Sequence, residues 1–354
     1  MKVFIKISVR FLAIAIFLVI SNFIYEAYFL EADIQKHSSV INKVRAVQDS
    51  CEVIYLGESS NTAYSWSDTD VRSISEMMGA YFPGIKTGAI SKGAWHAGNY
   101  LTLLRNIPED SKIKTVVVTL NMRSFNAEWI YSRLETAINK SMVLLQPRYP
   151  LINRFCLSFK AYDVKNKNER NAQVRRKMRN DKFDLPFDFS YDNVADWEAD
   201  VWEMGSYNKD GTRDISKNKM ASIYVKTYAF QIDPDNNPRI DDFDEIVHLA
   251  KERNWNLVFN LLAENHEKAK ELIGDTLVYF MEYNRKLLTD RYTSMGVVVV
   301  DNLYAVGDSS FYDQTWTTEH YDQKGRKTVA RNVAEALKKF YPNQFVEHDS
   351  ILIK

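Results

Sequence analysis

Four short apolar runs lie along the chain, and each predicts a buried β-strand. Valine, isoleucine and leucine dominate them, and a polar loop follows each one. Apolar residues at consecutive positions, without polar alternation, indicate strands buried on both faces, as in a parallel sheet covered by helices. The runs are Glu52–Gly57, Lys114–Asn121, Asn256–Leu262 and Gly296–Asn302.

Helical spacing fills the segments between these runs. Val71, Ile74, Met77 and Phe82 share one face of a predicted helix that Asp68 or Thr69 would cap. Since strands and helices alternate, the pattern predicts the α/β fold class. Further helices are predicted at Tyr100–Ile107, at Asp241–Arg253, after Asn265 as the N-cap, and at Gly325–Tyr341.

The N-terminal segment has the pattern of a membrane anchor. No charge occurs from Phe11 to Tyr25, and the apolar character resumes after Glu26 as far as Leu30. Basic residues precede the run and acidic residues follow it, so the rest of the chain is expected outside the cytoplasm, in the periplasm or at the cell surface. A cleaved signal peptide is the alternative, although no small-x-small cleavage site follows the run.

We therefore divide the chain into an anchor (1–31), a polar helical stalk (32–50) and one α/β domain (51–345). The domain contains a polar insertion at 148–238 with a basic run, which we interpret as a solvated face. Trp197 and Trp202 in the insertion are expected to be structural, with a sugar-binding groove as the alternative. Cys51 is expected in the core, and a disulfide with Cys156 stays open.

Composition narrows the choice of partners. The 46 basic and 46 acidic residues give a formal net charge of zero, which argues against nucleic acid as a partner. No cluster has metal-ligand spacing and no glycine-rich phosphate loop is present, so neither a metal nor a cofactor is expected.

The candidate chemistry follows the predicted strands, because ligands of open α/β sheets bind at the carboxyl ends of their strands. Ser59 follows the first strand and Asn121 ends the second, with Gly93 between them. His320 precedes the last helix. A hydroxyl, an imidazole and several N–H donors are what acyl transfer requires.

In this order the blocks resemble those of the SGNH, or GDSL-type, serine hydrolases. "YLGESSN" is similar to the family's first block, with Glu58 in place of its aspartate, and "TEHYDQKGRKTVA" is similar to its histidine block. The resemblance implies a flavodoxin-like three-layer fold. It implies Ser59 as nucleophile, His320 as base, and an oxyanion hole of the Ser59 amide, Gly93 and Asn121.

One position departs from the family pattern. The family has an aspartate three residues before the histidine, and Thr317 stands there. Glu319, Asp313 or Thr317 itself are the candidates to orient the imidazole, and a Ser–His dyad with a backbone carbonyl is a further alternative. Arg123 is a candidate to bind an anionic substrate group, although a structural ion pair is favoured.

The resemblance implies a serine esterase or O-acyltransferase that acts on an extracytoplasmic carbohydrate. Relatives of this kind often work with a multi-spanning membrane acyltransferase, which is therefore an expected partner besides the membrane and the glycan. The alternative function is a catalytically inactive SGNH-like domain that binds glycans or scaffolds an envelope complex. Hydrolysis and transfer use the same residues, so the sequence leaves that choice open.

Overall fold

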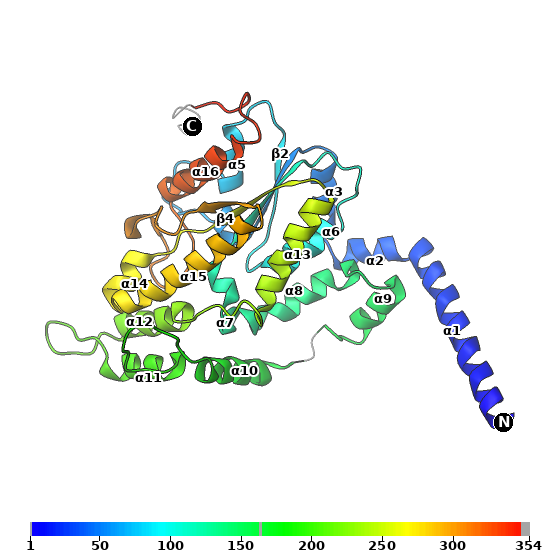
Figure 1. The fold of residues 1–354 in the computed structure, drawn as a ribbon, viewed down its shortest axis with the longest axis horizontal. Helices are drawn as coiled ribbons and strands as arrows, with labels where there is room; N and C mark the ends of the chain where they lie inside the picture. The colour runs from blue at the N-terminus through cyan, green and yellow to red at the C-terminus, as the bar shows by residue number, and fades with distance from the viewer. Residues whose placement is uncertain (1, 163–164, 348–354) are drawn as a thin grey trace.

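The fold is built on one five-stranded sheet. The computed structural model describes residues 2–162 and 165–347. All strands are parallel, in the order β2-β1-β3-β4-β5, which is the order of flavodoxin-like doubly wound sheets (Figure 1). The predicted α/β class is confirmed. The strands are β1 (Val53–Gly57), β2 (Thr87–Ser91), β3 (Thr115–Leu120), β4 (Asn256–Leu261) and β5 (Val298–Asp301).

The edge strand β2 was not predicted from the sequence. Its five residues, TGAIS, include only one fully buried side chain, Ile90. The other four predicted strands all occur, each within two residues of its predicted ends.

Helices cover both faces of the sheet and make three layers. Ile54 and Leu56 of β1 face one helical layer, while Val53 and Tyr55 face the other. The first layer contains α3 (Val40–Gln48), α6 (Ala97–Arg105), α13 (Pro238–Glu252) and α15 (Asp275–Ser294), and the second contains α5 (Ile74–Ala80) and α16 (Gln323–Leu337). Figure 1 shows α5 and α16 together on one side of the sheet, opposite α13.

The predicted start of α5 was wrong. Ser73 caps this helix in a reciprocal capping box with Glu76, and Val71 lies outside it, 55% exposed. Asp68 instead accepts a hydrogen bond from the buried Arg326 guanidinium at 2.9 Å. The predicted Asn265 cap is confirmed for α14 (His266–Leu272).

At the N-terminus, the helix α1 (Lys2–Tyr28) is long and apolar enough over Val3–Tyr28 to span a membrane. It leads away from the domain and ends beside α9 (Pro150–Ser158) (Figure 1). The Leu151 amide donates to Asn22 Oδ1 at 3.0 Å, and Arg154 pairs with Asp33 at 2.7 Å.

The stalk prediction for 32–50 needs correction. The segment after α2 (Leu30–His37) forms α3, which buries Val40, Ile41 and Val44 in the core beside the sheet. Ser38 and Ser39 before these positions, and Asn42 and Lys43 between them, concealed the apolar face in the sequence. This segment is therefore part of the domain rather than a spacer.

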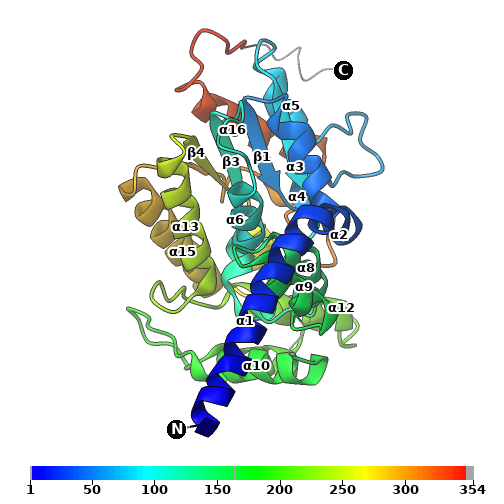
Figure 2. The ribbon, with the colours of Figure 1, turned by 90° about the vertical axis from the view of Figure 1, so that its right-hand side faces the viewer.

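The described part of the insertion at 148–238 is helical and is seen in green in Figure 2. Besides α9 it holds α10 (Lys167–Asn180), α11 (Val194–Met204) and α12 (Ile215–Tyr228). Trp197 is buried in a separate hydrophobic cluster with Phe280 and Met281 of α15, so its predicted structural role is confirmed. Trp202 is 42% exposed. Cys51 is buried as predicted, and both cysteines are free.

Three short helices and three 3-10 turns complete the described elements. They are α4 (Ser59–Thr62), α7 (Ala127–Ile130) and α8 (Leu134–Met142), with 3-10 turns at Met122–Phe125, Val143–Leu145 and Asp308–Ser310.

Candidate active site

Ser59 is the first residue of α4, directly after β1. The strand order places β2 on one side of β1 and β3 on the other, so the chain winds in opposite directions from this point. Such a switch point opens a crevice at the carboxyl ends of the two central strands, where doubly wound proteins bind ligands. Ser59 follows β1 at this crevice and Asn121 follows β3.

His320 reaches the same crevice from the opposite end of the chain. Its Nε2 lies 3.1 Å from Ser59 Oγ, across a separation of 261 residues. The Tyr312 ring stacks on the imidazole at 5.8 Å between centroids, and an antiparallel bridge between Phe311 and Tyr321 holds the loop closed. The predicted nucleophile and base are therefore within hydrogen-bonding distance of each other.

Glu58 contacts the candidate nucleophile more closely than the sequence suggested. Its carboxylate caps α4 by accepting the backbone N–H groups of Ser59 and Ser60, at 3.1 and 3.3 Å. It also accepts the Ser59 hydroxyl at 3.0 Å. Glu58 and His320 thus compete for a single hydroxyl proton, and the Ser59 amide of the predicted oxyanion hole already has an acceptor.

The other two predicted oxyanion donors lie nearby. A Cβ placed on Gly93 would be 4.0 Å from Ser59 Cβ, so this loop passes beside the serine. Asn121 Oδ1 accepts the Arg123 amide at 2.9 Å, which leaves its Nδ2 as the donor. Among the described residues neither Asn121 Nδ2 nor the Gly93 amide has a hydrogen-bond partner. Asn121 and Glu58 line one small cavity together.

None of the three predicted orienting residues contacts the His320 ring. Thr317 Oγ1 lies 3.1 Å from Thr227 Oγ1, and Asp313 accepts hydrogen bonds from Thr315 and Thr318. Glu319 turns away into the protein and binds Arg123. Within residues 2–162 and 165–347, the imidazole has one side-chain hydrogen bond, to Ser59. The geometry is that of a dyad.

Arg123 belongs to a buried charged cluster beneath the site. Its Nε and Nη2 donate to the two carboxylate oxygens of Glu319, and its guanidinium lies 5.1 Å from the centroid of the Trp129 ring. This is the structural ion pair that the sequence favoured. Burial by itself would lower the pKa of Arg123. The charge of Glu319 and the hydrogen bonds to it together outweigh that effect, so the net shift of the pKa is upward.

Glu264 completes this cluster and was not predicted as part of the site. Tyr228 donates to its Oε2 at 2.6 Å. Burial raises the pKa of Glu264 well above its usual value, and the Glu319 charge raises it further. One arginine thus faces two carboxylates, and both burial and the neighbouring carboxylate favour the protonated form of Glu264. The position of Glu264 shortly after β4 was the one feature of the sequence that pointed to a place near the site.

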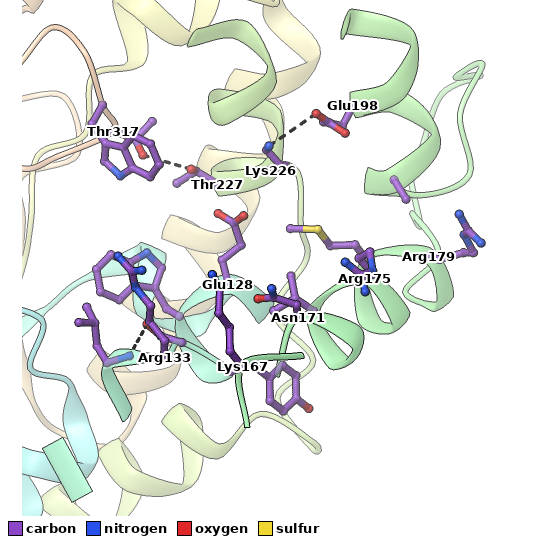
Figure 3. Close-up of a pocket in the computed structure, with 18 of the residues that line it drawn as sticks. Glu128, Arg133, Lys167, Asn171, Arg175, Arg179, Glu198, Lys226, Thr227 and Thr317 are labelled. Carbon is purple, nitrogen blue, oxygen red and sulfur yellow. Dashed lines mark hydrogen bonds and ion pairs between the residues drawn. The ribbon is translucent and has the colours of Figure 1, made fainter. Parts of the chain in front are cut away.

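A large groove lies between the segment that follows β3 and the insertion, and neither Ser59 nor His320 is among its lining residues. Its volume is about 780 Å³. Trp316 and Thr317 line it from the loop that leads to His320, and Trp129 lines both the groove and the small cavity beside Glu58. Figure 3 shows basic side chains of α10 along one wall. The basic lining residues are Arg133, Lys167, Arg175, Arg179 and Lys226.

The described part of the chain contains no group of three or more His, Cys, Asp or Glu residues placed to hold a metal ion. Comparison with known proteins finds no family model and no curated protein that matches the chain. The structure itself gives the class: an α/β protein with a parallel sheet and an N-terminal apolar helix.

Proposed function

We propose that this chain is a membrane-anchored serine esterase or O-acyltransferase of the SGNH kind, acting on acyl esters of an extracytoplasmic carbohydrate. The observation that supports it best is the 3.1 Å contact between Ser59 Oγ and His320 Nε2 at the switch point of the sheet. The resemblance of the sequence blocks to the SGNH family and the strand order 2-1-3-4-5 agree with this proposal.

In the proposed reaction, Ser59 Oγ attacks the acyl carbonyl carbon and its proton passes to His320 Nε2. The new C–O bond gives a tetrahedral oxyanion, which the Asn121 Nδ2 and Gly93 N–H donors stabilise. When the ester C–O bond breaks, the departing alcohol takes the proton from His320. An acyl-enzyme on Ser59 remains.

In the second half, a hydroxyl donates its proton to His320 while its oxygen attacks the acyl-enzyme. Water as the attacking group gives hydrolysis, and a sugar hydroxyl gives transfer. Ser59 recovers its proton from His320 as the acyl bond to it breaks. A multi-spanning membrane acyltransferase that supplies the acyl donor is part of the proposal for the transfer reaction.

A second candidate function is an inactive SGNH-like domain that binds glycans. The arrangement of Glu58 favours it, because this carboxylate occupies both the hydroxyl and the amide of Ser59. The dyad also lacks a carboxylate behind His320, which in serine hydrolases keeps the imidazole in its productive tautomer.

Covalent labelling of the full chain with a fluorophosphonate probe separates the two functions. We expect labelling of the wild type, its loss in Ser59→Ala, and a decrease of about 10³-fold or more in His320→Ala. Ser60→Ala and His266→Ala are the matched controls: each lies at the same edge of the sheet, and among the described residues neither side chain forms a hydrogen bond with Ser59 or His320. Absence of labelling in folded wild-type protein would reject catalysis by Ser59 and leave the binding function.

A further inference from the structure

The large groove has an unusual excess of positive charge. Five basic and two acidic side chains line it, although the whole chain has a net charge of zero. One acid, Glu198, lies 3.6 Å from Lys226 and so offsets one of the five cations. The other, Glu128, has a raised pKa, chiefly because it is buried.

Among the described residues, the remaining four cations have no counterion. Arg133, Lys167, Arg175 and Arg179 are exposed, and none forms an ion pair or hydrogen bond with its side chain inside the described ranges 2–162 and 165–347. By contrast, Lys177 on the same helix pairs with Asp181 at 2.8 Å. The groove therefore keeps its cations available to a ligand.

Three of these cations form a regular stripe. Lys167, Asn171, Arg175 and Arg179 recur at intervals of four along α10, so they occupy one face of the helix. Figure 3 shows this face toward the groove, opposite Glu198 and Lys226. Like charges four residues apart repel and destabilise a helix, and an anion bound along the stripe would relieve that repulsion.

Two tryptophan rings are among the lining residues of the groove. Trp316 is 47% exposed, four residues before His320, and Trp129 lines the groove beside the Arg123 guanidinium. An exposed indole offers a flat apolar face with a polar edge, which suits the face of a sugar ring. Rows of cations suit repeated carboxylate or phosphate groups.

We propose that this groove binds an anionic glycan, a sugar chain bearing carboxylate or phosphate groups, and places one of its residues at Ser59. This assignment rests on the proposed function for the link to Ser59. The glycan lies along the α10 stripe, with the ionic groups on Arg175 and Arg179 and a sugar ring on Trp316. The basic run of the insertion is then a binding face rather than a solvated one.

The test uses the full chain in phosphatidylcholine nanodiscs and two probes with the same backbone. Oligogalacturonide carries a carboxylate on each ring, and its methyl ester is neutral. We expect calorimetry to detect binding of the first and not of the ester. A glycerol-phosphate oligomer distinguishes phosphate from carboxylate as the preferred group, and binding of either anionic probe supports the proposal.

Substitutions then locate the site. Arg175→Gln together with Arg179→Gln is expected to weaken binding about tenfold, from typical exposed ion pairs. The matched control is Arg176→Gln, which removes a charge from the same helix outside the groove and should leave affinity unchanged. Trp316→Ala should also weaken binding, and Trp316→Phe should restore part of it.

Three results would overturn the proposal: equal affinity for the acid and its ester, equal losses in Arg176→Gln and the groove variants, or no binding of any anionic probe. Binding is also measured in Ser59→Ala, where it should equal the wild type. If fluorophosphonate does not label Ser59 but the groove variants lose binding, the catalytic function fails and the glycan site stands. If labelling succeeds and no anionic probe binds, the function stands and the groove assignment is wrong.

Discussion

The ion pair of Arg123 with Glu319 gives the sharpest prediction about how the site is held. Both side chains are at most 4% exposed, and Glu264 adds a second acid to the same buried cluster. Arg123→Met removes the only cation of this cluster while keeping a similar volume. We expect it to lower the free energy of unfolding by about 3–5 kcal/mol, the usual cost of leaving one half of a buried ion pair.

Urea unfolding of the full chain, followed by tryptophan fluorescence, measures this loss. The loss should grow from pH 5 to pH 8, because the uncompensated carboxylates must either ionise in the interior or hold their protons against a rising pH. Arg123→Met combined with Glu319→Leu should recover much of the stability, since no unpaired partner remains.

Arg105 with Glu245 supplies the matched control, because this pair lies 36% and 56% exposed on the surface. Arg105→Met should cost less than about 1 kcal/mol. If Arg123→Met costs no more than Arg105→Met, or if the double variant is as unstable as the single one, the view of this cluster as a tightly coupled buried unit is wrong.

Three further predictions follow from single residues. Glu264→Gln should flatten the pH dependence of stability above pH 4.5. A carboxyl group with a raised pKa in the folded state binds more protons folded than unfolded, so the stability of the wild type falls as pH rises through that range. Urea titrations from pH 5 to 8 would show the difference. His96 accepts a hydrogen bond from the Gly98 amide at 3.2 Å, and burial, followed by the Arg239 charge, lowers the pKa of His96. The stability of the folded protein should therefore fall as pH decreases below 6.5. In the same titration, His96→Asn should remove this loss of stability. Ser73→Ala should cost about 1 kcal/mol in thermal unfolding by removing the α5 cap, and Ser73→Asp should restore most of it.

The sequence was most informative where burial is complete. Runs such as Val116–Val118 lie in the middle of the sheet, so their apolar character on both faces predicts strands without any knowledge of the neighbours. The edge strand β2 is half exposed and contains Gly88, and its pattern resembles that of a loop. Helix starts depend on which polar residue reaches a free N–H, and Asp68 or Thr69 was predicted in this role, whereas Ser73 fills it.

The sequence also predicted that the site residues lie together at the carboxyl edge of the sheet, because each follows a strand or precedes the last helix. These residues are Ser59, Gly93, Asn121 and His320. The partner of the imidazole was beyond the reach of this reasoning. Glu319 is adjacent to His320 in sequence, yet its side chain points to the opposite side of the strand-like segment and meets Arg123. Side chains of neighbouring residues in extended backbone point in opposite directions. The adjacency of Glu319 and His320 in the sequence therefore suggested a contact that the two side chains do not make.

The continuous run from α1 through α2 into α3 has a mechanical consequence for the proposed function at a membrane. α9 contacts α1 through Asn22 and α2 through Asp33, and α3 is packed in the core, so no slack tether separates the apolar helix from the sheet. With α1 in a bilayer, the crevice would be kept at one height and could search for substrate only by lateral diffusion and rotation about the membrane normal. Its substrates would have to meet it at that height, which favours chains that grow from, or pass along, the membrane surface.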